Sequence, residues 1–312
     1  MVGPITTLTL NPVVDVRTEA DRVRGDAKIR CSPPVREPGG GINVARVLKR
    51  LGSDPLALFP GGGGPAEDLN EHLSAEGVAH RIVPLHGETR ENLLVRERAS
   101  GAEYRFAMPG PPLGEVETAR IRAELEALEP APDYLVISGS LPPGASPGYL
   151  AALVRAAADR GTRAVVDPSG QGLCELAAPD SGVYMLTPNG GELAQLVRRD
   201  LPDQGAREQA ARSLLAGQTE RAVVVTLGSQ GALLVTPDAR IWFRAPPVTV
   251  VSRLGAGDSM LAGLVHRLSE GAGLEEAVRF GVATGAAAVA TPGNGLGEEL
   301  DLSPFLAQTV AA

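Results

Sequence analysis

The C-terminal two thirds of the chain alternate short apolar runs with longer amphipathic segments. Runs that are apolar at consecutive positions are typical of strands buried on both faces of a parallel sheet, and four of them cover 134–137, 164–166, 183–186 and 222–227. Between and after these runs, apolar residues recur with helical spacing. This spacing predicts helices at 115–129, 147–160, 190–199, 205–217, 257–270 and 274–290. Such alternation predicts βαβ units, and hence an α/β fold with a mostly parallel sheet.

Other segments depart from this rhythm. The runs 231–235 and 241–243, which flank Pro237 and Asp238, predict a hairpin on the sheet. Residues 13–37 and 88–108 are polar, rich in β-forming residues and without helical periodicity. We interpret both as strands of a small accessory sheet that projects from the main body, where a lid would sit. Because no linker, repeat or low-complexity tail is visible, we expect a single domain that spans residues 1–312.

Composition narrows the class of protein. With 312 residues, 43% hydrophobic and 21% charged, the chain can bury a large core. A formal charge of −8 disfavours nucleic-acid and anionic-membrane partners, and 3% aromatic residues offer few stacking platforms. Cys31 and Cys174 cannot form a disulfide framework. No signal peptide or membrane-length apolar stretch is apparent, so we expect a cytoplasmic enzyme.

The charge is unevenly distributed along the sequence. Residues 1–50 contain nine Lys or Arg and five Asp or Glu, although the whole chain is acidic. Several of the basic residues cluster at positions 22–36. This cluster indicates either a solvated strand face or a site for a small anionic ligand such as a phosphate.

The most informative motif is Gly255-Ala256-Gly257-Asp258, which precedes an apolar helix. The glycines allow a tight turn close to a ligand, and the helix start offers unpaired N–H groups to an anion. A carboxylate placed there can accept a proton from a hydroxyl group while those N–H groups hold a phosphoryl group. Asp258 alone would also fit a simple helix N-cap.

A second glycine run, Gly39–Gly41, opens a helix that contains Asn43. It favours close approach of a ligand, with Asn43 available to sugar hydroxyls, although a flexible loop before a helix would look similar. Upstream, we interpret Asp15 as the carboxylate that ends the first strand. Carboxylates at the carboxyl ends of strands commonly point into the ligand crevice of an α/β sheet.

Two further loops follow predicted buried strands. Asn189 and Glu192 lie at a helix start, where Glu192 can hold a hydrated magnesium ion or simply favour the helix dipole. The loop from Thr226 to Gly231 suits a nucleotide at the sheet edge, or an ordinary turn. Other motifs are missing: Gly61–Gly64 is not followed by Gly-Lys-Ser/Thr, no GxGxxG or GxSxG is present, and the four histidines lack metal-ligand spacing.

The order of these motifs resembles the PfkB (ribokinase-like) carbohydrate kinases. Gly-Gly-Gly-Ile-Asn-Val-Ala at 39–45, Asn189-x-x-Glu192 and Gly-Ala-Gly-Asp at 255–258 carry the resemblance, which covers essentially the whole chain. Within the family, residues 29–46, 103–110 and 136–144 are most similar to the 6-phosphofructokinase branch. The resemblance implies a three-layer α/β/α domain with a small β-sheet lid, through which two subunits pair as a homodimer.

The resemblance also implies a reaction, namely ATP-dependent phosphorylation of a phosphosugar, with fructose 6-phosphate as the first expectation. Fructose 1-phosphate and tagatose 6-phosphate are the alternatives within the family. A non-catalytic relative that binds sugar or nucleotide is the alternative from another class. The expected cofactors are ATP with Mg²⁺, and K⁺ as a monovalent activator.

Roles for individual residues follow from the same resemblance. Asp258 is expected to be the catalytic base, and Gly255, Ala256 and Gly257 the anion hole. The expected acceptor contacts are Asp15, Lys28, Arg30, Gly40, Gly41, Asn43, Arg90 and Ser140, with Arg30 acting across the dimer. The expected nucleotide contacts are Asn189, Thr226, Gly228, Ser229 and Gly231, and Glu192 is expected to hold Mg²⁺ through water. The sequence departs from the 6-phosphofructokinase branch at Thr187 and Gly191, where that branch carries lysines, and at Arg253, where threonine is usual.

Overall fold

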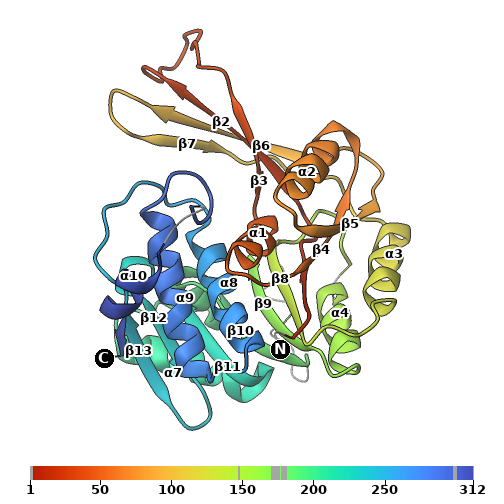
Figure 1. Cartoon of the computed structure of the whole chain (residues 1–312), viewed down its shortest axis with the longest axis vertical. Helices are drawn as coiled ribbons and strands as arrows, with labels where there is room; N and C mark the ends of the chain where they lie inside the picture. Colours follow the sequence, from red (N-terminus) through yellow and green to blue (C-terminus); the bar gives the residue numbers. More distant parts are fainter. Residues whose placement is uncertain (1–2, 147, 170–175, 177–180, 298–300, 312) are drawn as a thin grey trace.

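Two β-sheets and the helices that cover the larger one make up the fold (Figure 1). The computed structural model describes residues 3–146, 148–169, 176, 181–297 and 301–311. Residue 147, at the start of one expected helix, and Cys174 lie outside the described residues, whereas Cys31 is an exposed free thiol. The predicted α/β class with a mostly parallel sheet and a second, smaller sheet is confirmed.

The larger sheet has ten strands among the described residues, in the order β14-β13-β12-β11-β10-β9-β8-β1-β4-β5. Their bounds are β1 (Ile5–Leu8), β4 (Leu56–Gly61), β5 (Ala79–Pro84), β8 (Tyr134–Ser140), β9 (Arg163–Ser169), β10 (Val183–Leu186), β11 (Thr219–Thr226), β12 (Ala232–Val235), β13 (Arg240–Arg244) and β14 (Val310–Ala311). In this order, each pair of neighbouring strands from β11 across to β5 is parallel, and β12, β13 and β14 add an antiparallel edge. The predicted hairpin is the β12–β13 pair.

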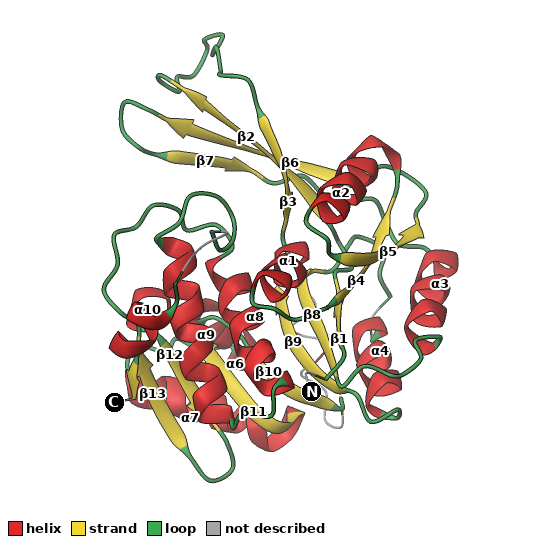
Figure 2. Cartoon of the chain, in the orientation of Figure 1, coloured by secondary structure: helices red, strands yellow, loops and turns green. Residues whose placement is uncertain are grey.

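Helices pack on both faces of this sheet, because its central strands are apolar on both faces. Along β8, Tyr134 and Val136 face one core cluster, and Leu135 and Ile137 face another. The first face carries α1 (Ile42–Arg50), α2 (Gly63–Ala75), α8 (Ala256–Ser269) and α9 (Leu274–Val289). The second carries α3 (Glu115–Glu126), α4 (Tyr149–Ala158), α6 (Gly190–Val197) and α7 (Gln204–Gln218), while α10 (Ser303–Gln308) lies against α9. The result is a three-layer arrangement (Figure 2).

The smaller sheet projects from these layers, at the top of the view in Figure 2. Its order is β3-β2-β6-β7, with bounds β2 (Val13–Ala20), β3 (Val35–Gly39), β6 (Arg90–Glu97) and β7 (Glu103–Phe106). Four large apolar side chains on or directly after these strands are 37–52% exposed: Val35, Leu93, Phe106 and Met108.

One expectation about the first strand is wrong. Strand β1 ends at Leu8, and Asp15 lies inside β2 of the smaller sheet, paired in register with Glu37 and Asn92. The chain therefore leaves the larger sheet before Asp15, and Asp15 does not end a strand of that sheet. None of the helices in the described part of the chain has the length and apolar character needed to cross a membrane.

Candidate active site

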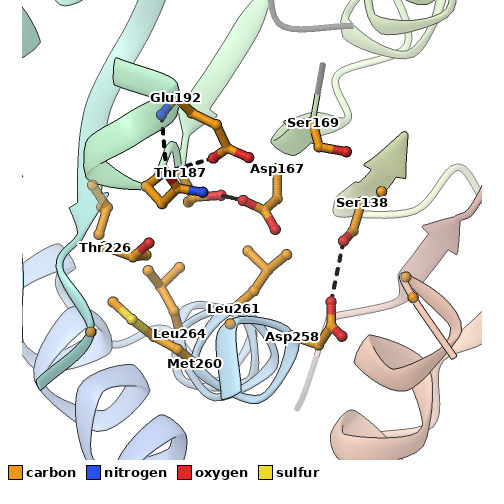
Figure 3. A pocket seen from close by; sticks show the side chains of 17 residues that line it. Ser138, Asp167, Ser169, Thr187, Glu192, Thr226, Asp258, Met260, Leu261 and Leu264 are labelled. Carbon is orange, nitrogen blue, oxygen red and sulfur yellow. Dashed lines mark hydrogen bonds between the residues drawn. The ribbon is translucent and has the colours of Figure 1, made fainter. Parts of the chain in front are cut away.

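A cavity of about 440 Å³ opens at the carboxyl ends of the central strands (Figure 3). Residues at or directly after the ends of β8, β9, β10 and β11 line one part of it, and the first turn of α8 lines another. This is the position where ligands bind in open α/β sheets. We call it the central cavity.

Asp258 lies in the first turn of α8 and lines the central cavity. The N-cap position belongs to Gly255, so Asp258 is not the N-cap, and no side chain of the described residues caps this helix start. Within that part of the chain, the N–H groups of the first turn have no side-chain acceptor and can serve an anion. Gly255 has φ +68°, and a Cβ there would lie 2.2 Å from the carbonyl oxygen of Asn294, so only glycine fits the turn.

The carboxylate of Asp258 faces two side-chain donors from other elements. Asn43 Nδ2 lies 3.5 Å from Asp258 Oδ2, and Ser138 Oγ lies 3.5 Å from Oδ1. Burial is the largest cause that raises the pKa of Asp258 to about 6; the charge of Asp15 acts in the same direction, and the two hydrogen bonds act against it. A carboxylate with this pKa is ionised at neutral pH and matched to proton transfer.

The glycine run 39–41 brings backbone to the same place. Gly40 and Gly41 line the central cavity, and Asn43 follows in α1. A Cβ on Gly41 would lie 2.5 Å from the carbonyl oxygen of Ser138, which explains why the loop can approach β8 so closely.

Two carboxylates, Asp167 and Glu192, line the opposite part of the central cavity (Figure 3). Burial, together with the charges of Asp258 and Glu192, raises the pKa of Asp167 to about 7. Thr187 Oγ1 donates to Asp167 Oδ1 at 3.1 Å. Burial likewise raises the pKa of Glu192, against hydrogen bonds with Asn189. A divalent cation would relieve this repulsion, and two carboxylates are a donor set that suits Mg²⁺ bound with substrate phosphates and water.

Asn189 and Glu192 also stabilise their own helix. Asn189 Oδ1 accepts from the N–H groups of Gly191 and Glu192, and Glu192 Oε2 accepts from the N–H of Asn189 at 2.8 Å. This is a capping box. No group of three or more His, Cys, Asp or Glu that could enclose a metal occurs in the part of the chain that the structure describes.

The loop after β11 lies beside this helix start. Thr226 N donates to the carbonyl oxygen of Pro188 at 2.9 Å, and Thr226 and Gly228 line the central cavity. Ser229 is exposed and lines a neighbouring hollow with Gln230 and Trp242. Gly231 is buried, and a Cβ there would meet the carbonyl oxygen of Phe243 at 1.8 Å, so this glycine is needed for the turn.

A polar cluster joins the smaller sheet to the end of β8. Asn11 Nδ2 donates to Ser140 Oγ at 2.9 Å, and Asn92 Nδ2 donates to Asp15 Oδ1 at 3.0 Å. Arg90 donates to the carbonyl oxygens of Asn11 and Met108, and no ion pair of Arg90 is found among the described residues. Burial lowers the pKa of Arg90, with only the charge of Asp15 opposing. A partly buried guanidinium bonded to neutral oxygens is suited to an anionic ligand.

Lys28 and Arg30 lie elsewhere. Both are exposed in the segment between β2 and β3, where they line a separate hollow with Arg22, Arg24 and Arg98. The structure does not bring them to the central cavity of their own chain.

Asp167 is the main cavity residue that the motifs did not single out. A signal was available, because Asp167 directly follows the buried run 164–166, at the carboxyl end of its strand. The same signal, a carboxylate at the end of an apolar run, also pointed to Asp15, but Asp15 lies on the smaller sheet.

The chain is similar to known carbohydrate kinases over most of its length. A family model described as pfkB family carbohydrate kinase matches residues 9–300. An ATP-dependent 6-phosphofructokinase isozyme 2 from Escherichia coli strain K12 is 42% identical over 293 residues, which cover 94% of each chain. A protein of the same name from Mycobacterium tuberculosis is 39% identical, covering 96% of this chain and 88% of that one. A Vibrio cholerae 1-phosphofructokinase and a Staphylococcus epidermidis tagatose-6-phosphate kinase are 30% and 31% identical.

Solved structures resemble the whole chain. The structure of Escherichia coli phosphofructokinase-2 with fructose-6-phosphate has a TM-score of 0.89 and 41% identity, and covers 98% of each chain. The same protein in complex with potassium has a TM-score of 0.91 and 40% identity, with 98% of each chain covered. These similarities extend over both sheets and the central cavity.

Proposed function

Because the chain belongs to the pfkB family of carbohydrate kinases, we propose that it transfers the γ-phosphoryl group of ATP to fructose 6-phosphate, yielding fructose 1,6-bisphosphate. One observation carries the proposal. Asp258 stands at the start of α8 in a cavity that Asp167 and Glu192 also line, and the charge of Asp15, from the polar cluster, acts on its carboxylate.

Asp258 acts as the general base in this proposal. Its ionised carboxylate accepts the proton of the acceptor hydroxyl as the oxygen attacks the γ-phosphorus and the bond to ADP breaks. The N–H groups at Gly255, Ala256 and Gly257 hold the charge of the transferring group. Asn43 and Ser138 orient the carboxylate, since each lies 3.5 Å from one of its oxygens.

The acceptor lies toward the smaller sheet. Asp15, Gly40, Gly41 and Asn43 contact its hydroxyl groups in this proposal. Gly40 and Gly41 line the central cavity, Asn43 donates to Asp258, and the charge of Asp15 acts on Asp258. Arg90 and Ser140 hold its phosphate, which supplies the ion-pair partner that Arg90 lacks among the described residues.

ATP lies along the ends of β10 and β11. Asn189, Thr226 and Gly228, which line the central cavity, form its contact surface, with Ser229 at the neighbouring hollow and Gly231 shaping the loop. Asp167 and Glu192 would hold Mg²⁺ there through water. Bound magnesium supplies positive charge that neutralises the phosphates during transfer. We extend the potassium of the related structure to this chain as a monovalent activator, with Arg253 as the family-atypical residue near that site.

Two subunits pair through the smaller sheet, which then acts as the lid, in this proposal. Val35, Leu93, Phe106 and Met108 expose apolar surface that pairing would cover. Lys28 and Arg30 lie on the same projecting sheet and would reach the acceptor phosphate of the partner subunit. Light scattering after size-exclusion chromatography tests this: the wild type is expected to have twice the mass of the Phe106→Asp variant, and equal masses contradict the pairing.

The proposed reaction is tested by ADP release with Mg-ATP and a panel of acceptors. The panel contains fructose 6-phosphate, fructose 1-phosphate, tagatose 6-phosphate, fructose, ribose and adenosine. The highest kcat/KM is expected for fructose 6-phosphate. A preference for another phosphosugar replaces the acceptor and keeps the chemistry, whereas ATP binding without turnover on any acceptor refutes the kinase.

A further inference from the structure

A buried arginine outside the central cavity connects the groups that surround Asp258. Arg46 lies on α1, one turn after Asn43, and is 8% exposed. Its Nη1 donates to Asn43 Oδ1 and to Asn294 Oδ1, each at 3.0 Å. Its Nε and Nη2 donate to the two oxygens of Glu76, at 2.7 and 2.5 Å.

We propose that Arg46 is a positioning residue for phosphoryl transfer: it fixes the amides of Asn43 and Asn294, and through them the Asp258 carboxylate, the Gly255 turn and the end of β3. This inference rests on the proposed role of Asp258 as the base. It adds a residue that contacts neither substrate nor the reacting atoms.

The argument begins with the chemistry of the guanidinium. Arginine has only donors, so an asparagine that contacts it must present Oδ1 and turn Nδ2 away. For Asn43, the Nδ2 atom then lies 3.5 Å from Asp258 Oδ2 and donates to the base. With the amide reversed, an oxygen would face the carboxylate and repel it.

Asn294 is oriented in the same way. Its Nδ2 donates to the carbonyl oxygen of Pro38 at 2.5 Å, at the point where β3 leads into the glycine run. Its own carbonyl oxygen packs against Gly255, at 2.2 Å from where a Cβ would stand. Through these two contacts, Asn294, which is 5% exposed, links the strand end of the smaller sheet directly to the start of α8.

Glu76 fixes the guanidinium itself. A carboxylate that accepts two parallel bonds holds the guanidinium plane, which lysine cannot reproduce with a single ammonium group. The same Glu76 also pairs with Arg50 at 3.2 Å, while Arg50 Nη1 donates to the carbonyl oxygen of Leu296. Arg50 is therefore a matched control, because its recorded bonds include Glu76 but neither Asn43 nor Asn294.

The first experiment compares Arg46→Met with Arg50→Met in the full-length protein, using steady-state kinetics on the best acceptor of the panel. Loss of a residue that orients a catalytic group costs about 10- to 100-fold in activity. We expect this loss in kcat for Arg46→Met, with KM for acceptor and ATP changed less than about threefold. Arg50→Met is expected to retain kcat, and Arg46→Lys is expected not to restore it.

The pH profile gives a readout that a merely structural role would not move. The hydrogen bond from Asn43 lowers the pKa of Asp258, so its loss in Arg46→Met shifts the acidic limb of kcat/KM to higher pH. The groups that face Asp258 are Asn43 from α1, Ser138 from β8, Asp15 from β2 and Asp167 from β9, and only the first is altered. Arg50→Met leaves the limb in place.

A double-mutant cycle completes the test. If Arg46 acts partly through Asn43, adding Arg46→Met to Asn43→Ala is expected to lower kcat by a smaller factor than Arg46→Met does in the wild type, and the factor that remains is the share that passes through Asn294. Additive losses, or equal kcat values for folded Arg46→Met and Arg50→Met, overturn the inference. If Arg46→Met does not fold, Glu76→Gln takes its place, and an unchanged kcat and pH limb overturn it. An inactive wild type, or an Asp258→Asn variant as fast as wild type, refutes the proposed function separately.

Discussion

The pH dependence of turnover tests the proposed base most directly. Burial raises the pKa of Asp258 from its ordinary 3.8 to about 6, and Asp15 adds to this shift while Asn43 and Ser138 oppose it. The base must be ionised to accept a proton. Activity is therefore present above this pKa and is lost as the pH falls through it.

The size of the effect follows from this pKa. With a pKa of about 6, the ionised fraction is about nine tenths at pH 7, half at pH 6 and one tenth at pH 5. The kcat/KM for the acceptor, which reports the free enzyme, is therefore expected to fall about tenfold between pH 7 and pH 5. An aspartate with the ordinary pKa of 3.8 would lose less than about a tenth over the same range.

The assay measures ADP in quenched samples, so that no coupling enzyme limits the pH range. Because a sugar phosphate also titrates near pH 6, the wild-type profile alone does not assign the limb. Two variants separate the groups: Asn43→Ala removes a bond that lowers the pKa of Asp258, and Asp15→Asn removes a charge that raises it. The limb is expected to move to higher pH in the first and to lower pH in the second, while the titration of the substrate stays the same.

Asp258→Asn provides the end point of this series. Loss of a general base costs about 100- to 10,000-fold in kcat, which corresponds to about 3–5 kcal/mol. A profile that is flat from pH 7 to pH 5, a limb that moves the same way in both variants, or near-normal kcat in Asp258→Asn would refute the reasoning.

Three other predictions follow from the neighbouring groups. Arg90→Ala is expected to raise the acceptor KM and lower the kcat/KM preference for fructose 6-phosphate over fructose; an unchanged preference removes Arg90 from the phosphate site. Glu192→Gln keeps the capping bond to the Asn189 N–H but weakens the magnesium site. The Mg²⁺ concentration for half-maximal turnover is therefore expected to rise about tenfold, while Tm stays unchanged. An unchanged Mg²⁺ requirement counts against that site. Burial raises the pKa of Glu76, but the bond and charge of Arg46 outweigh burial and hold that pKa below its ordinary 4.5. Glu76→Gln is therefore expected to lower the free energy of unfolding in urea by about 1–3 kcal/mol at pH 7, and this loss shrinks as the pH falls below 4.5. An equal loss at pH 7 and below pH 4.5 contradicts this linkage.

The sequence predicted the larger sheet well because its strands are buried on both faces and are therefore apolar at consecutive positions. Because the runs around Tyr134 and Val183 are apolar at consecutive positions, both faces of these strands must be covered by other parts of the chain, as they are in the centre of the larger sheet. Asp15 was misplaced for a related reason. Val13, Val14 and Val16 surround it with the same apolar character, and only the tertiary structure decides that the chain leaves the larger sheet after Leu8.

Residues brought together from distant segments could not be predicted in the same way. Arg46 and Asn294 are 248 positions apart, and neither belongs to a local pattern that indicates the other. Asp167 had a local signal, its position after a buried strand, but many strands end in a carboxylate. What distinguishes Asp167 is its position in the folded chain, where the charges of Asp258 and Glu192 raise its pKa.

The distribution of charge explains why one cavity can accept two anionic substrates. Asp167, Glu192 and Asp258 line the central cavity together, and the charges of the other two raise the pKa of Asp167. Free ATP would bring its phosphates against these carboxylates, whereas Mg-ATP brings a cation between them. In the proposed complex, the acceptor phosphate instead binds Arg90 in the polar cluster. Asp258 is half-buried in this cavity, so in the proposed complex the bound acceptor and Mg-ATP themselves must cover it and keep water from competing with the acceptor hydroxyl for the transferred group.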